Sequence, residues 1–246
     1  MKKLTLSIAS IVALSSLSFA GGEVVEPPVV VVPPVVEETS DLTISANMAM
    51  VSKYIWRGMD QNRGNMAIQG GIDVEYKGFY VGAWASNGDF DTATENSSIE
   101  LDLYAGYRFE VATIGFDIGA IAYLYPGVTD DWDETSKEAY VGVSKEFGNF
   151  GLGATFSYDF DAVNEDGDEG TYNVQFDASV KTIAEITVAG SFGMNNAAGA
   201  TDDYYFSVGA SKTVGKFDIG VAYHGYYNDA LDDTTDHIVA SISTSF

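Results

Sequence analysis

The chain has no cysteine, two histidines and twelve basic side chains in 246 residues. The absence of cysteine excludes a disulfide framework, a thiol nucleophile and a thiolate metal site. Acidic side chains number 36, so the net charge is -24. The chain therefore lacks the basic surface that supplies most of the affinity for nucleic acid, and we expect no nucleic-acid partner.

Long hydrophobic runs are missing after residue 20, so no helix of the ~18 or more apolar residues needed to span a membrane is expected there. The chain begins with Lys2 and Lys3, continues with a mostly apolar stretch over 4–17, and reaches Ser18-Phe19-Ala20. A charged start, a short apolar stretch and a small-x-small site are typical of a secretory signal peptide. We therefore predict a signal peptide over 1–20 and an exported mature chain.

Proline is scarce, and four of its five occurrences lie within residues 21–40. Proline pairs remove ladder donors and favour extended polyproline II structure. We interpret 21–40 as a Pro/Val-rich periplasmic linker, with a plug or partner-binding strand as the alternative.

In the rest of the chain, apolar and polar residues alternate over long stretches. Over 41–246 this alternation forms about twelve segments of ~10–13 residues, the length of tilted barrel strands. The first is predicted over Leu42–Arg57, with Tyr54 and Trp56 on its apolar face, and the last over 237–246. We predict an all-β fold for 41–246, a transmembrane antiparallel up-and-down β-barrel with one apolar and one polar face.

The connections alternate between short turns and long loops, and the long loops hold many of the acidic residues, as in Asp161–Gly170. Short periplasmic turns and long external loops are the topology of bacterial outer-membrane barrels. We expect a bacterial outer-membrane location and outer-membrane lipid as a partner. A last strand that ends at Phe246 also predicts recognition by the barrel-assembly machinery.

Residues 45–87 contain a block of short motifs: Val51-Ser52-x-Tyr54, Arg57-Gly58, Ala67-Ile68-Gln69-Gly70-Gly71, Gly78-Phe79-Tyr80 and Trp84-Ala85-Ser86-Asn87. This block resembles the opening of the TorF family, porin-like outer-membrane proteins of proteobacteria with largely unassigned roles. The resemblance covers the first three predicted strands. It implies a porin-like barrel and supplies neither a catalytic residue nor a solute.

Charged side chains on the polar face of the strands are the candidate pore lining. They are Lys53, Arg57, Asp73, Glu75, Glu100, Asp102, Arg108, Asp117, Asp159, Asp177 and Asp218. Rings of charge can set ion preference, and acids outnumber bases here. We predict a passive channel for ions or small solutes with a weak preference for cations. The alternative is a structural or interaction barrel with a closed lumen and acidic loops that bind divalent ions or a partner.

Two further sites can be weighed. His224 and His237 lie on the polar face of consecutive strands near Asp229 and Asp236, a donor set that suits Zn²⁺, Cu²⁺ or Ni²⁺. The loop Asp161–Gly170 fails the EF-hand spacing, which leaves loose binding of divalent cations open. No serine-centred nucleophile motif stands out. We therefore expect no cofactor and no enzymatic activity.

Overall fold

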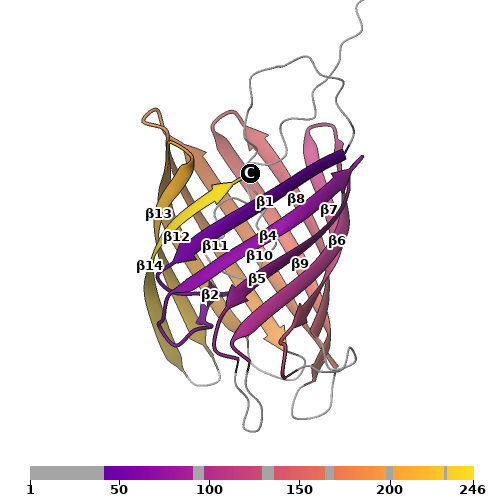
Figure 1. Cartoon of the computed structure of the whole chain (residues 1–246), viewed down its shortest axis with the longest axis vertical. Coiled ribbons are helices and arrows are strands. Elements are labelled where there is room, and N and C mark those ends of the chain that lie inside the picture. The colour runs from indigo at the N-terminus through magenta and orange to yellow at the C-terminus, as the bar shows by residue number, and fades with distance from the viewer. Residues whose placement is uncertain (1–41, 91–96, 129–135, 164–168, 198–201, 230–231) are drawn as a thin grey trace, which may run out of the picture.

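The computed structural model of the protein describes residues 42–90, 97–128, 136–163, 169–197, 202–229 and 232–246. Twelve of its fourteen strands form one closed antiparallel barrel, in which each strand pairs with its neighbours in the chain (Figure 1). No helix long and apolar enough to cross a membrane occurs in these ranges. The predicted signal peptide (1–20) and linker (21–40) lie outside the described residues.

The barrel strands, in chain order, are β1 (Leu42–Val51), β4 (Ala67–Tyr76), β5 (Phe79–Asn87), β6 (Ile99–Val111), β7 (Ile114–Leu124), β8 (Ser136–Phe147), β9 (Phe150–Val163), β10 (Glu169–Lys181), β11 (Ile186–Ala197), β12 (Asp203–Val214), β13 (Phe217–Asn228) and β14 (Asp233–Ser245). The remaining two, β2 (Ile55–Trp56) and β3 (Met59–Asp60), pair with each other. The predicted fold class and strand number are confirmed.

Large apolar side chains cover the outside of the barrel, because alternate residues of a strand point to opposite faces. Along β4, for example, Ile68 and Ile72 are half exposed, whereas Gln69 between them is buried in the interior. The same alternation puts Phe150, Leu152 and Phe156 outside on β9. An apolar exterior and a polar interior are the arrangement of a barrel whose wall contacts lipid.

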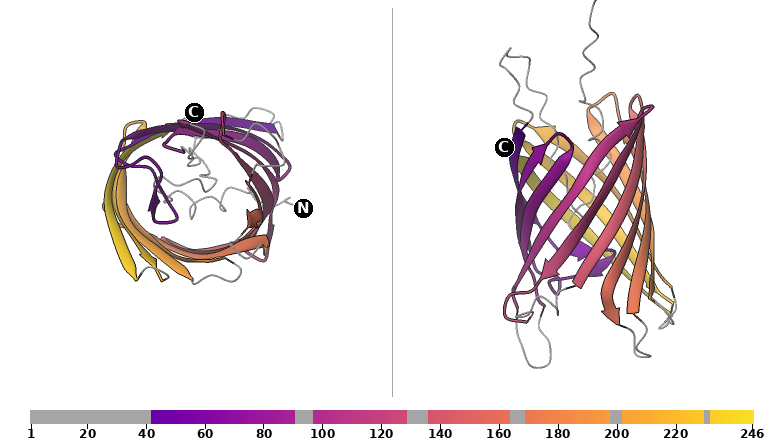
Figure 2. Two further views of the ribbon diagram at one scale, coloured as in Figure 1. Left: turned by 90° about the horizontal axis from the view of Figure 1, so that it is seen from below. Right: turned by 90° about the vertical axis from the view of Figure 1, so that its right-hand side faces the viewer.

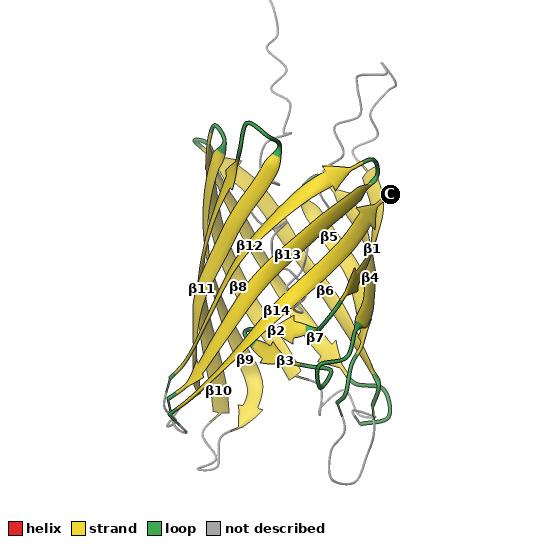
Figure 3. Cartoon of the chain, turned by 90° about the vertical axis from the view of Figure 1, so that its left-hand side faces the viewer, coloured by secondary structure: helices red, strands yellow, loops and turns green. Residues whose placement is uncertain are grey.

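Short connections gather at one end of the barrel, which we call the turn end, and long ones at the other, the loop end (Figures 1 and 3). At the turn end, two-residue turns join β4 to β5 and β6 to β7, and both central residues have positive φ: Lys77 (53°) with Gly78 (86°), and Ala112 (51°) with Thr113 (67°). These angles match type I′ turns, whose twist suits tight hairpins.

The barrel closes between β1 and β14, as predicted for the last strand. Five residue pairs, from Asn47–Ser245 to Val51–Ser241, make the ladder. Phe246 extends it, because its N–H donates to the Ala46 carbonyl (2.8 Å) and its carbonyl accepts from the Ala46 N–H (3.1 Å). The C-terminal phenylalanine therefore lies at the turn end of the closing seam, with its side chain 76% exposed.

The first predicted strand is too long, and this is the main correction to the fold. β1 ends at Val51 rather than Arg57, and residues 52–66 leave the wall and enter the barrel at its loop end (Figure 2). Tyr54 and Ile55 are 0% and 2% exposed inside the barrel. The predicted lipid-facing placement of Tyr54 and Trp56 is therefore wrong. The apolar parity of this segment instead serves packing in the lumen.

Candidate functional site

A short hairpin inside the loop end of the barrel, β2 and β3 with their connecting turn, is the most distinctive element of the site. We call residues 55–60 the finger hairpin. Its turn is Arg57-Gly58, with φ of 46° and 84°, flanked by the pair Trp56–Met59. Two consecutive residues of positive φ define a type I′ turn, for which glycine is suited and arginine is not. The strained Arg57 backbone marks this tip as a functional candidate.

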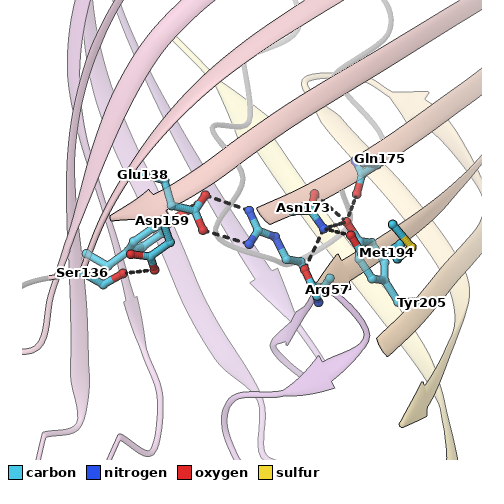
Figure 4. A network of polar contacts seen from close by, with 10 residues as sticks. Arg57, Ser136, Glu138, Asp159, Asn173, Gln175, Met194 and Tyr205 are labelled. Atoms are coloured by element: carbon cyan, nitrogen blue, oxygen red, sulfur yellow. Dashed lines mark hydrogen bonds and ion pairs between the residues drawn. The ribbon is translucent and has the colours of Figure 1, made fainter. Parts of the chain in front are cut away.

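Arg57 reaches across to β8. Its two terminal nitrogens donate to the two oxygens of Glu138, both at 2.8 Å, in a bidentate ion pair (Figure 4). The side chains are 6% and 4% exposed. Burial lowers the pKa of Arg57, but Glu138, Tyr123 and Tyr205 together raise it by more, so the guanidinium stays charged. A buried pair of this geometry holds the finger tip against β8, since separating it leaves two charges without partners.

The other side of the finger tip abuts the opposite wall. A Cβ added to Gly58 would lie 2.9 Å from the Cβ atoms of Tyr205 on β12 and Tyr226 on β13. Tyr205 is fixed in turn, because its hydroxyl donates to Gln175 (2.9 Å) and accepts from Asn173 (2.8 Å) on β10 (Figure 4). The finger hairpin therefore spans the lumen from β8 to β12 and β13.

Aromatic side chains pack around the base of the finger. Tyr54 meets Trp84 edge to face with ring centroids 5.8 Å apart, and its hydroxyl donates to Glu100 at 2.6 Å. Burial, and then the nearby Glu100, raise the pKa of Tyr54 well above its usual value, so the hydroxyl stays a donor. Trp56 packs against Tyr123 of β7 at 6.0 Å.

The acidic side chains of the lumen fall into two groups, each with one arginine. At the loop end, Glu100, Asp102 and Glu138 are buried, Asp102 lies within electrostatic range of the other two, and Glu138 pairs with Arg57. Toward the turn end, Arg108 contacts Asp117 (3.2 Å) and Glu75 (3.4 Å). Both groups keep an excess of carboxylates over guanidinium.

Three tyrosines contact the turn-end group of charged side chains, directly or through one another. The Tyr104 hydroxyl donates to Asp73 at 2.5 Å, and the Tyr80 hydroxyl donates to Asp117 at 2.7 Å. Tyr80 also contacts the hydroxyl of Tyr140 and carries the Arg108 guanidinium over its ring at 3.7 Å. These contacts gather bulky side chains on the side of the lumen formed by β4 to β8.

The remaining predicted lining residues are more scattered. Asp159 on β9 accepts from Ser136 at 2.6 Å, Asp177 on β10 accepts from Gln175, and Asp218 on β13 accepts from Thr213 near the turn end. Lys53 lies in the inward segment instead of on a strand, with its ammonium 3.4 Å from His237. Lys53 and Arg57 therefore reach the lumen by a different route from the one the alternation predicted.

His224 and His237 are paired directly opposite each other in the β13–β14 ladder. Two histidines alone are too few ligands for a metal site. In the described ranges, no group of three or more His, Cys, Asp or Glu could hold a metal ion. The acidic residues 164–168, on which the divalent-cation hypothesis depends, lie outside the described residues.

Sequence reasoning missed two components of the site. Glu138 was not among the predicted lining residues, although it shares the parity of Tyr140 and Gly142 on β8. The finger turn was also missed. Its signal was a glycine after Arg57, between apolar residues, at the position where a two-residue hairpin turn would place it.

A family model described as "Bacterial protein of unknown function (Gcw_chp)" matches residues 36–244. The chain belongs to this family. No curated protein has detectable sequence similarity to this Gcw_chp protein.

Solved structures similar to this Gcw_chp protein include two porins. The KdgM porin has a TM-score of 0.54 and 10% identity over 82% of this chain and 98% of that one, and it is also known in complex with disordered oligogalacturonate. The NanC porin has a TM-score of 0.53 and 12% identity over 83% and 99% of the two chains. At these identities the similarity shows the fold alone: a porin-like β-barrel.

Proposed function

We propose that this protein is an outer-membrane channel for passive diffusion of ions or small solutes, with the finger hairpin as its constriction. The observation that carries the proposal is a charged, polar lumen inside a closed barrel, narrowed at one end by a segment of the chain itself. The porin-like fold supports this function, and the TorF resemblance of residues 45–87 points the same way as a prediction. The turn end would face the periplasm.

The passage would run along one side of the lumen. Apart from Tyr205, Tyr226 and His224 near the finger tip, strands β9 to β14 and β1 present many small inward residues, where β4 to β8 present tyrosines, a tryptophan and arginine. Examples are Gly153, Ser191, Ser207, Gly209 and Ser241. Because bulky side chains gather on β4 to β8 and the finger tip lies against β12 and β13, we infer that water and solutes pass the finger on the β9–β11 side.

Cation preference is the finer part of the proposal. Glu100, Asp102 and Glu138 outnumber Arg57 among the buried charged groups at the loop end. Charged rings of this kind concentrate counter-ions in a narrow path. We expect permeating K⁺ to be favoured over Cl⁻.

Planar-bilayer recording tests both parts. The purified, folded protein should produce discrete conductance steps in KCl, and a KCl gradient should give a reversal potential of the sign expected for cations. Heat-denatured protein is the control. Anion selectivity would refute the charge argument, and an absence of steps from folded protein would refute the channel.

The alternative is a barrel whose lumen stays closed, with a structural or interaction role. The specific observation in its favour is the finger hairpin, which reaches from β8 to β12 and β13. Under this alternative, wild-type protein is silent in bilayers, and loosening the finger does not produce steps either. A finger variant that conducts while the wild type is silent would instead indicate a gated channel.

Other roles of the exterior follow from the proposed location. Lipid would contact the apolar outer face, and the assembly machinery would recognise β14 and Phe246. Deleting Phe246 should lower the amount of protein in purified outer membranes without changing its synthesis. Equal amounts in the membrane would remove Phe246 from that recognition.

A further inference from the structure

The guanidinium of Arg57 occupies a well-formed cation site at the loop end of the lumen. Glu138 binds it through both oxygens at 2.8 Å, and the ring of Trp56 lies 4.5 Å from its central carbon. The Tyr123 hydroxyl donates to the same Glu138 carboxylate at 3.4 Å. A planar fork facing a carboxylate, with an aromatic ring at its face, is the geometry that recognises guanidinium rather than a point charge.

The site holds more carboxyl groups than Arg57 pairs with. Asp102 is 1% exposed and lies within electrostatic range of Glu138 and Glu100. One of its carboxylate oxygens is buried and has no hydrogen-bond partner within the described parts of the chain. A buried carboxylate oxygen without a donor favours the approach of a further cation.

We propose that Glu138, with the carboxylates and rings around it, is a binding site for guanidinium-bearing organic cations. Arg57 fills this site in the resting structure, and such solutes compete with Arg57 and release the finger hairpin. The release of the finger as an opening event rests on the proposed channel function. The binding site itself does not.

Three features of Arg57 favour its displacement from the site by a free guanidinium. The desolvation of a buried ion pair offsets much of its attraction, so exchange of one guanidinium for another costs little. The Arg57 backbone is in the left-handed region (φ 46°), which glycine adopts freely and most L-residues adopt rarely. A short tether gives an effective concentration on the order of millimolar, so free solute of similar concentration competes.

Replacing the tethered cation tests the site. Arg57→Gly keeps a turn residue that tolerates positive φ and leaves Glu138 without its guanidinium. Methylguanidinium chloride is titrated into the folded protein in detergent, with tryptophan fluorescence as the readout. We expect saturable binding at least tenfold tighter in Arg57→Gly than in wild type or in the double variant Arg57→Gly/Glu138→Gln.

Arg63→Gly is the matched control. Arg63 also has positive φ (48°), but its side chain is 70% exposed and pairs with Asp89 outside this site. It should bind methylguanidinium as the wild type does. Methylammonium chloride at equal ionic strength should bind Arg57→Gly at least tenfold more weakly, since it cannot make the bidentate contact.

The outcomes separate the site from the channel. Equal binding by Arg57→Gly and the double variant, or equal binding of methylammonium, overturns the site. If Arg57→Gly does not fold, as judged by heat-modifiable migration, Arg57→Asn replaces it, because asparagine also tolerates positive φ. Bilayer conductance of the wild type should rise with millimolar methylguanidinium. Binding without conductance in any variant would refute the channel and leave the site in place.

Discussion

At the residue scale, two arginine–carboxylate pairs of the loop end differ in burial and should differ in energy. Arg57–Glu138 and Arg63–Asp89 have the same 2.8 Å separation, but the first pair is 6% and 4% exposed and the second 70% and 21%. Solvent screens the exposed pair, so it contributes little. The buried pair has no solvent to replace a lost partner.

Glu138→Gln should therefore destabilise the barrel by ~3 kcal/mol or somewhat more, since it leaves the Arg57 guanidinium buried without a counter-charge. Asp89→Asn should cost less than ~1 kcal/mol. Urea unfolding of the protein in lipid vesicles measures both. A loss of similar size in the two variants would show that Arg57 finds water or another carboxylate when Glu138 is neutral.

At the element scale, the finger hairpin needs Gly58 for two reasons. The glycine allows the turn conformation, and it also lets the tip lie against β12 and β13. Gly58 and Gly148 both have positive φ, 84° and 68°. A Cβ at Gly58 would meet Tyr205 and Tyr226, whereas a Cβ at Gly148 has nothing within 4 Å. The two sites therefore share backbone strain and differ in the space around them.

Gly58→Ala should displace the finger and increase single-channel conductance, because the tip can no longer lie against β12 and β13. Gly148→Ala carries only the strain of a left-handed alanine, about 1–2 kcal/mol, and should leave conductance unchanged. Bilayer recording of both variants is the measurement. An unchanged conductance in Gly58→Ala would mean that the finger does not define the narrowest part of the path.

The same element shows how far alternation alone can predict this fold. Strands such as β6 and β10 have one apolar and one polar face, and lipid and lumen impose that pattern directly. Residues 52–56 keep the apolar parity of β1, yet they contact Trp84 and Tyr123 in the lumen instead of lipid. Alternation shows which side chains avoid water. An apolar side chain avoids water equally well against lipid and in a packed cluster inside the lumen. Glu138 was missed because its importance comes from a partner 81 positions away.

At the scale of the whole molecule, the apolar exterior should tolerate charge according to depth. Ile72 lies in the middle of β4, half exposed on the outer face, and Ile183 lies fully exposed in the turn-end connection between β10 and β11. Arginine costs ~2–4 kcal/mol near the bilayer midplane and about 0–1 kcal/mol near the interface.

Ile72→Arg should therefore lower the free energy of unfolding in lipid vesicles by ~2–4 kcal/mol, and Ile183→Arg should change it by less than ~1 kcal/mol. The comparison uses the same substitution at two depths, so the intrinsic properties of arginine cancel. Equal effects would indicate that the outer face of β4 does not lie in the hydrocarbon.

The strand that closes the barrel also anchors the segment that carries the finger hairpin. The first residues of the inward segment are attached to β14, since the Ser52 N–H donates to the Ala240 carbonyl, the Ala240 N–H donates to the Ser52 hydroxyl, both at 2.9 Å, and Lys53 approaches His237. The anchor of the finger is thus β14, the strand that pairs with β1 to close the barrel. A barrel in which β1 and β14 have not paired lacks these contacts, so the position of the constriction depends on closure of the wall.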